Sequence, residues 1–213
     1  MCGRFSQYHL GEAFNELFGI EIFPDFVQSR NVSPGQSPLI VVYDEVYHRN
    51  EAITAKWGFV PFWQTKKGYG VINARSETIA EKPFFKNAWK HHRCIIPVNS
   101  FYEWKKTEQG KIPYRFRYAS DSLLYLAGLY DINEKAADKR TVTFCIITMP
   151  ANQLMEPVHD RMPVILDGDR AVEWLGTTGM EVKLNIRDYP GLVSEQVSGE
   201  INNSSFTGEV RPV

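Results

Sequence analysis

The sequence predicts an α+β protein, a single domain with a curved, mostly antiparallel β-sheet that is barrel-like and flanked by a few helices. Segments rich in β-branched and aromatic residues outnumber those with helical periodicity. The 213 residues, 43% of them hydrophobic, suffice for one sizeable core. Because no repeat, low-complexity tract or linker divides the chain, we place the domain at residues 1–205 and a polar tail, loop or disordered, at residues 206–213.

Three segments predict helices. Apolar residues at helical spacing predict an amphipathic helix over residues 10–19. Pro83 suits the first position of a second helix that reaches about residue 91. Asp169, as an N-terminal cap, predicts a third helix that extends through Trp174.

Most of the remaining pattern predicts strands. The predicted strands are residues 39–43, 46–57, 114–118, 123–129 and 142–148. Between two of them, Ser120-Asp121-Ser122 predicts a hairpin turn.

Charge and cysteine content exclude several classes of protein. The formal net charge of −1 gives no overall support for nucleic-acid binding, so such a role needs a local basic patch. Cys2, Cys94 and Cys145 fit neither a disulfide framework nor a zinc-finger spacing, and the last two lie in apolar runs typical of buried, inert thiols. We expect no cofactor and no metal ion. No membrane span or secretory signal is visible, and we expect a cytoplasmic, nucleoid-associated monomer.

Cys2 follows the initiator methionine directly. Removal of Met1 would leave an amine and a thiol on adjacent carbons, and both titrate close enough to neutrality to react. Such a pair can attack an amide, as in N-terminal nucleophile hydrolases, or condense with an aldehyde and close to a thiazolidine. Taken alone, the dipeptide also fits an incidental second residue.

Three internal stretches carry further candidate site residues. If the segment is extended, Asn73, Arg75 and Glu77 share one face, which could line a site or simply face solvent. Glu103 sits among aromatic residues, where desolvation would suit it to exchange protons with the Cys2 amine, although it could instead pair with Lys105 on the surface.

The third stretch places His159 and Arg161 on one strand face before an apolar run. Histidine can move protons near neutral pH and arginine can bind phosphate. A single histidine is also commonly structural.

Six stretches together resemble one known family. They are Met1–Phe5, Asn31–Gly35, Trp57–Pro61, Asn73–Thr78, Phe101–Trp104 and His159–Pro163. In this order, from residue 1 to about 205, they are similar to the SOS response-associated peptidase-like (SRAP) family, also called abasic-site processing proteins. The resemblance implies DNA repair by self-crosslinking to abasic sites in single-stranded DNA, through a thiazolidine at the N-terminal cysteine. It also implies lyase-like chemistry and an older assignment as a thiol autopeptidase that removes Met1.

The same resemblance implies roles for individual residues. Cys2 matches the nucleophile and Asn73 the asparagine that steadies the opened sugar. Glu103 matches the carboxylate near the cysteine amine, and His159 the histidine that assists opening of the deoxyribose ring. The implied DNA-binding positions are Arg4, Pro34, Trp63, Arg75, Thr148 and Arg161.

Two positions depart from the family pattern. Asn99-Ser100 replaces an Asp-Gly pair that commonly precedes the aromatic motif, which could change the turn that presents Glu103. Gln64 follows Trp63 where some members have a second tryptophan, which affects how the protein would stack against bases.

The predicted second helix offers a local basic patch. Lys82, Lys86 and Lys90 recur every four residues, while Phe85 and Trp89 form another stripe. The lysines could add salt-dependent affinity for DNA or simply be solvated.

Two other functions stay open at the level of the sequence. A glutamine amidotransferase of the N-terminal nucleophile class also begins Met-Cys-Gly, but its His-Thr-Arg and Asn-Gly segments are missing from this chain. A non-catalytic single-stranded-DNA-binding module would use the aromatic residues and arginines and leave Cys2 idle.

Overall fold

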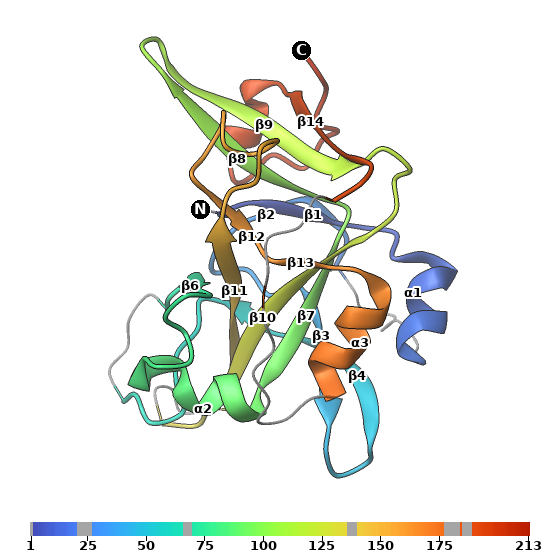
Figure 1. Ribbon diagram of the computed structural model, residues 1–213, viewed down its shortest axis with the longest axis vertical. Helices are drawn as coiled ribbons and strands as arrows, with labels where there is room; N and C mark the ends of the chain where they lie inside the picture. Colours follow the sequence, from blue (N-terminus) through green and yellow to red (C-terminus); the bar gives the residue numbers. More distant parts are fainter. Residues whose placement is uncertain (1, 21–26, 66–69, 136–139, 177–183, 185–188) are drawn as a thin grey trace.

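The computed structural model describes residues 2–20, 27–65, 70–135, 140–176, 184 and 189–213. Within these residues the chain forms two β-sheets, three α-helices and one short 3-10 helix. In Figure 1 the smaller sheet lies above the larger one, and helices α2 and α3 lie beside the larger. The sheets are curled and mostly antiparallel, so the predicted α+β class is confirmed.

The smaller sheet has five strands in the order β14-β9-β8-β1-β2, and all its neighbours are antiparallel. Its strands are β1 (Phe5–Gln7), β2 (Ser29–Val32), β8 (Ser100–Thr107), β9 (Gly110–Tyr118) and β14 (Leu192–Gln196). The first strand after Cys2 is therefore central, paired on both sides.

The larger sheet has nine strands. Its main order is β12-β11-β10-β7-β3-β4; β13 pairs with β10, and the short β5 and β6 run parallel to β11. Its strands are β3 (Leu39–Asp44), β4 (Arg49–Thr54), β5 (Lys56–Trp57), β6 (Asn73–Arg75), β7 (Arg93–Val98), β10 (Leu124–Asn133), β11 (Thr141–Pro150), β12 (Arg161–Pro163) and β13 (Ile165–Leu166).

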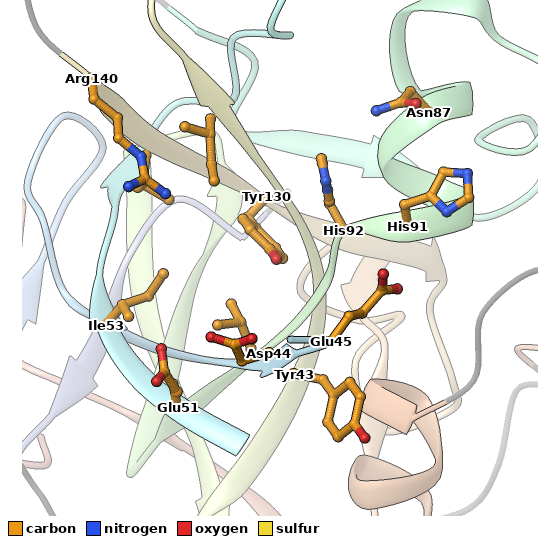
Figure 2. Close-up of a pocket in the computed structure, with 13 residues that line it drawn as sticks. Tyr43, Asp44, Glu45, Glu51, Ile53, Asn87, His91, His92, Tyr130 and Arg140 are labelled. Atoms are coloured by element: carbon orange, nitrogen blue, oxygen red, sulfur yellow. The ribbon is translucent and has the colours of Figure 1, made fainter. Parts of the chain in front are cut away.

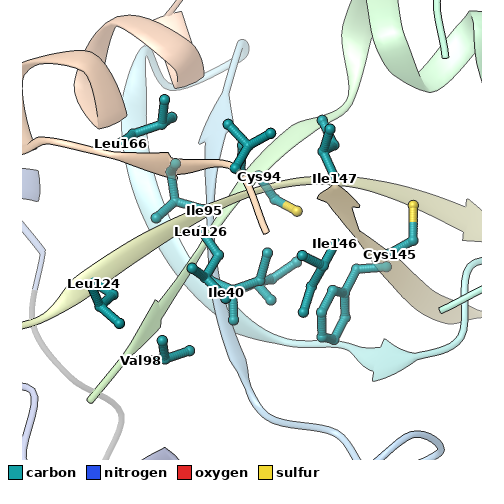
Figure 3. Packing of buried hydrophobic residues seen from close by; sticks show 14 of the residues in the cluster. Ile40, Cys94, Ile95, Val98, Leu124, Leu126, Cys145, Ile146, Ile147 and Leu166 are labelled. Atoms are coloured by element: carbon teal, nitrogen blue, oxygen red, sulfur yellow. The ribbon is translucent and has the colours of Figure 1, made fainter. Parts of the chain in front are cut away.

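One hydrophobic core joins the two sheets. Phe5 of the smaller sheet packs on Trp57 of the larger, with ring centroids 4.9 Å apart. Figure 3 shows Cys94 and Cys145 among aliphatic side chains of this core. Both thiols are buried, which confirms that part of the prediction. Burial also raises the pKa of each thiol well above its usual range, and a neutral thiol is what the expectation of low reactivity requires.

All three predicted helices are present. They are α1 (Gly11–Phe18), α2 (Pro83–His91) and α3 (Gly168–Gly176). The predicted cap of α3 is wrong: Asp167, and not Asp169, accepts the N–H of Arg170 through its side chain at 3.0 Å. The indole of Trp174 then ties α3 to β7 by donating to the Cys94 carbonyl at 3.0 Å. No described helix is long and apolar enough to cross a membrane.

Two strand predictions need correction. Ser120-Asp121-Ser122 does not close a hairpin, because β9 belongs to the smaller sheet and β10 to the larger. The turn therefore carries the chain from one sheet to the other. The predicted strand 46–57 is interrupted at Ala55 and begins only at Arg49, because Asp44 caps the N–H groups of Val46 and Tyr47 in a turn.

The C-terminal residues are folded onto the smaller sheet. A 3-10 helix, η1 (Gly199–Asn202), buries Ile201, and Val210 is buried with it against Tyr102. The guanidinium of Arg115 donates to the Val210 carbonyl at 3.2 Å. Val210 and the partly buried Phe206 thus anchor residues 206–213 to a second small core, although most of these residues are exposed.

Candidate active site

The thiol of Cys2 is fully buried at the entrance to β1. Its Sγ lies 3.9 Å from the carbonyl oxygen of Arg4. Burial raises the pKa of the Cys2 thiol well above its usual range, and the negative charge of Glu103 raises it further. The structure therefore favours a neutral thiol at this position.

Glu103 reaches this thiol from β8. β1 and β8 are antiparallel with Phe5 opposite Phe101, and the N–H of Tyr102 donates to the Arg4 carbonyl at 2.9 Å. Continuing this register places Glu103 beside the backbone that leads out of Cys2. The Glu103 side chain is 3% exposed, which excludes the surface pairing with Lys105.

Asn73 approaches Cys2 from the other sheet. β6 runs parallel to β11, with Asn73 beside Ile146, and the Asn73 side-chain amide donates to the Cys2 carbonyl at 2.9 Å. Its Oδ1 atom is buried and accepts no hydrogen bond from any described residue. Asn73 thus fixes the backbone of Cys2 and presents an amide oxygen that can still accept a hydrogen bond.

Arg161 is held in a buried network next to this strand. Its guanidinium forms a bidentate ion pair with Glu77 and donates to the Thr148 carbonyl at 2.7 Å. The bonds from Arg161 lower the pKa of Glu77 to about 2. The predicted shared face of Asn73, Arg75 and Glu77 is only partly formed, because β6 ends at Arg75 and Glu77 lies in the following turn.

The Thr148 side chain is buried under that network. Its hydroxyl donates to the Ala74 carbonyl at 3.3 Å and lies 3.4 Å from Arg161 Nη2. In this conformation, therefore, Thr148 holds neighbouring residues and offers no side-chain surface to a ligand.

His159 lies in the bend before β12, so the prediction that it shares a strand face with Arg161 is wrong. Its Nδ1 is 3.0 Å from the Arg161 N–H and 2.9 Å from Asp160 Oδ1. One nitrogen cannot serve both, because it must accept from the first and donate to the second. The tautomer with its proton on Nε2 can accept from the Arg161 N–H, and the tautomer with its proton on Nδ1 can donate to Asp160.

Arg4 is partly buried on the outer side of β1. Its Nη1 donates to Asn31 Oδ1 at 2.8 Å, and the guanidinium carbon lies 6.0 Å from the ring centroid of Trp104. Burial lowers its pKa, and its Nε has no hydrogen-bond partner among the described residues. Arg4 is thus a desolvated cation whose one hydrogen-bonded side-chain partner is neutral.

Pro34, Trp63 and Arg75 are surface positions. Pro34 occupies an exposed turn after β2, and Arg75 is exposed at the end of β6, beside Thr148 of β11. Trp63 is 48% exposed and packs edge-on against Phe84 of α2, with ring centroids 6.1 Å apart. The exposed ring offers a face for stacking.

Helix α2 also has the two faces that the sequence predicts. Phe85 and Ala88 are buried, while Lys82, Lys86 and Lys90 are exposed. These lysines form a basic face on the helix whose Phe84 packs against Trp63.

A cavity of about 780 Å³ lies elsewhere, between the β3–β4 hairpin, the end of α2 and β10. Figure 2 shows Tyr130 and His92 near its centre, with Asp44, Glu45 and Glu51 nearby. Burial, helped by Glu45 and other negative groups, raises the pKa of Tyr130 to about 12. None of the candidate site residues lines this cavity, and its acidic rim would repel a DNA backbone.

Sequence reasoning missed two residues of the site. Asn31 contacts Arg4, whereas the sequence marks it only as part of a motif. Trp104 lies against Arg4, whereas the sequence marks it only as a neighbour of Glu103. For Asn31, the available signal is its place in the motif Asn31-Val32-Ser33-Pro34-Gly35. For Trp104, the run of aromatic residues does not indicate which face of the sheet its side chain occupies.

The arrangement gathers complementary chemical groups around Cys2. A thiol, a buried carboxylate and a fixed amide meet where the two sheets join, and the network of Arg161 lies along the adjacent strand. Such a set can form and break bonds to an electrophilic carbon while it moves protons.

Comparison with known proteins agrees with this architecture. The family model for SOS response associated peptidase (SRAP) matches residues 1–204. The chain is 37% identical to abasic site processing protein YoqW of Bacillus subtilis over 214 residues, which cover 95% of each chain. It is 32% identical to abasic site processing protein YedK of Escherichia coli, covering 82% of this chain and 79% of that protein.

A crystal structure of a Bordetella bronchiseptica protein superposes with a TM-score of 0.78 at 26% identity, covering 92% of this chain and all (100%) of that one. A second, from Bacteroides thetaiotaomicron, gives 0.78 at 23% identity, covering 93% of each chain, and shows likeness of fold alone. Sequence motifs, family match and fold therefore agree, and the chain belongs to the SRAP family.

Proposed function

We propose that this protein processes abasic sites in DNA, and that it does so by crosslinking itself, as a monomer, to an abasic site in single-stranded DNA. The bond is a thiazolidine made by the amine and thiol of Cys2 after removal of Met1. Relatives named abasic site processing proteins support the general activity. The observation that carries the chemistry is the buried Cys2 thiol beside the Glu103 carboxylate, at the second residue of the chain.

The reaction begins at the sugar. An abasic deoxyribose exchanges between a closed ring and an open aldehyde, and opening requires a proton to reach the ring oxygen. His159, whose Nδ1 lies within hydrogen-bond distance of both the Arg161 N–H and the Asp160 carboxylate, is the residue we assign to carry that proton. Asn73 Oδ1 can accept a hydrogen bond from a hydroxyl of the opened sugar.

The amine reacts before the thiol. The Cys2 nitrogen adds to the aldehyde carbon, and the resulting hydroxyl leaves as water to give an imine. Glu103 takes the proton that the nitrogen releases and returns it to the departing hydroxyl. The raised thiol pKa supports this order, because a neutral thiol is a weak nucleophile and is proposed to add only once the imine carbon lies beside it.

The ring then closes on the same carbon. Sγ adds to the imine carbon while its proton passes to the nitrogen, and the product is a five-membered thiazolidine. The net change is one C–N bond and one C–S bond formed for one water released. The adduct thereby shields the lesion.

Single-stranded DNA is the proposed partner because cationic and aromatic side chains that could bind it are exposed or only partly buried. Arg4, Arg75 and the α2 lysines are available for phosphates, and Trp63 is available to stack on a base. Arg161, already paired with Glu77, would contact a phosphate only by sharing its guanidinium with that carboxylate.

The direct test uses one single-stranded oligonucleotide with a single abasic site. Wild-type protein should give an adduct that survives a denaturing gel, and Cys2→Ala should give none, while Cys94→Ala serves as the matched cysteine control and should react normally. An adduct that persists in Cys2→Ala contradicts the proposal. Binding without an adduct would instead indicate a non-catalytic DNA-binding module, and ammonia release from glutamine would indicate an amidotransferase.

A further inference from the structure

We propose that residues 198–206, which we call the C-terminal strap, position Arg4 for a DNA phosphate through Asn31 and Trp104. The inference rests on the proposed function, since it assigns Arg4 to the DNA. It makes Asn31, Trp104 and the strap residue Asn202 positioning residues, none of which needs to touch the abasic sugar.

Asn31 connects Arg4 to the strap directly. Its Oδ1 accepts from Arg4 at 2.8 Å, while its Nδ2 donates to the carbonyls of Asn203 at 2.8 Å and Phe206 at 2.9 Å. Both amide protons are therefore used on the strap, which fixes the direction in which the amide oxygen points. That oxygen in turn fixes one end of the guanidinium.

Trp104 makes a second connection. Its indole N–H donates to Asn202 Oδ1 at 2.6 Å, and its ring lies beside the Arg4 guanidinium. The strap thus sets the positions of both groups that flank Arg4 on the outer face of the smaller sheet.

The C-terminal strap is anchored to the smaller sheet, so it can hold Asn31 and Trp104 in place. Ile201 is buried with Val197 and Val210 on Tyr102, and the N–H of Ser198 donates to the Arg211 carbonyl at 2.9 Å. The strap therefore belongs to the folded domain and can transmit order to Arg4.

The charges indicate what Arg4 is prepared to bind. Burial lowers the Arg4 pKa, the hydrogen bond from Nη1 goes to a neutral amide, and Nε has no partner among the described residues. Arg161 differs, because Glu77 already neutralises it. A desolvated guanidinium that is held in place without a carboxylate is suited to a phosphate group.

A pre-positioned Arg4 would lose less side-chain freedom on binding. Releasing the strap contacts should therefore weaken affinity by about fivefold, the cost of ordering one long side chain. The rate of bond formation at saturating DNA should not change, since the hydrogen bond from Asn73 to the Cys2 carbonyl does not involve the strap.

The test is a double-mutant cycle on undamaged single-stranded DNA. Asn202→Ala and Asn31→Leu should each bind about fivefold more weakly than wild type, yet add nothing when combined with Arg4→Ala. Ser204→Ala, at an exposed strap residue, and Asn50→Leu, which removes a comparable amide bond to the Phe18 carbonyl, are controls that should bind as wild type. Single-turnover crosslinking at saturating abasic DNA should keep its wild-type rate in Asn202→Ala.

The outcomes separate this inference from the proposed function. If wild type forms the adduct while Asn202→Ala and Asn31→Leu bind with unchanged affinity, the strap has no positioning role. If both variants weaken binding equally with and without Arg4, their effect is general and the inference is wrong. Absence of any adduct in wild type defeats the proposed function, whereas the affinity cycle still reports on Arg4. Asn202→Ala changes an exposed side chain, so its DNA affinity can still be measured and tests the inference even if Asn31→Leu fails to fold.

Discussion

The side-chain nitrogen of Asn73 lies 2.9 Å from the carbonyl oxygen of Cys2 and donates a hydrogen bond to it. This bond joins the start of the chain to β6 and, through the parallel pairing of β6 with β11, to the centre of the larger sheet. Cys2 is thus held by a sheet to which the strand that follows it, β1, does not belong.

Removing this bond should slow crosslinking. In Asn73→Ala the Cys2 backbone loses its fixed position and the sugar loses an amide acceptor, so we expect single-turnover adduct formation to fall about tenfold, the worth of one hydrogen bond. The measurement is the rate at saturating abasic DNA, with Asn87→Ala, exposed on α2, as control. An unchanged rate in Asn73→Ala would exclude the residue from the mechanism.

Glu103 should control the acidity of Cys2. Because burial and the Glu103 charge both raise the thiol pKa, Glu103→Gln removes one of the two causes and should lower that pKa. Alkylation of Cys2, followed by mass spectrometry across a pH series, should therefore begin at lower pH in the variant.

The same variant should form adduct more slowly near neutral pH, since a carrier of the amine proton is lost. Glu108→Gln, at an exposed turn residue, supplies the control and should match wild type in both measurements. If the pH at which Cys2 becomes alkylated is unchanged or higher in Glu103→Gln, Glu103 does not raise the pKa of the Cys2 thiol.

The ion pair of Glu77 with Arg161 should stabilise the fold in a pH-dependent way. Arg161 lowers the Glu77 pKa from 4.5 to about 2, so the stabilisation is complete above pH 4.5 and is lost as the pH falls toward 2. Glu77→Gln should lower the free energy of unfolding by about 1 kcal/mol at pH 7, a modest amount because the Glu77 side chain is 44% exposed to water.

Urea unfolding at several pH values checks this prediction. The difference between wild type and Glu77→Gln should narrow below pH 4.5, whereas Glu156→Gln, at an exposed residue, should show little difference at any pH. If the difference in the free energy of unfolding between wild type and Glu77→Gln stays constant through the acid range, the charge of the Glu77 carboxylate is not the source of the stabilisation.

Trp63 should contribute to DNA affinity. Its exposed ring can stack on one base, and loss of such a stack costs about 1–3 kcal/mol, so Trp63→Ala should bind single-stranded DNA at least about fivefold more weakly. Fluorescence anisotropy with an unmodified oligonucleotide measures this directly. Tyr47→Ala, at an exposed aromatic on the β3–β4 turn, is the control, and equal losses in the two variants would point to a non-specific effect.

The sequence predicted much of the local structure, although not the cap of α3 or the interruption of the strand at Ala55. Helix α2 begins at Pro83 and ends at His91 as predicted, because proline suits the first turn and the apolar residues repeat with helical period. Of the two alternatives that the sequence left for Glu103, the structure supports burial among its aromatic neighbours and not a surface position beside Lys105. These predictions depend on residues that are close together in the chain.

Long-range relationships were harder to predict. The turn at Ser120-Asp121-Ser122 was recognisable, but turn residues do not reveal which sheet the next strand will join. The partners of Asn31 lie 172 and 175 residues away, in a stretch whose polar composition hides the burial of Ile201 and Val210. Their positions depend on the packing of the completed sheet.

The central claim is that the amine and the thiol of Cys2 both enter the bond to DNA, and the most direct measurement is intact mass spectrometry of the adduct in two forms of the chain. Protein without Met1 should give a mass equal to the chain plus the abasic oligonucleotide less one water. A form with an uncleaved N-terminal extension has no free amine at Cys2 and should give no stable adduct until a protease exposes that residue. An extended form that crosslinks at the rate of the processed protein would contradict the account.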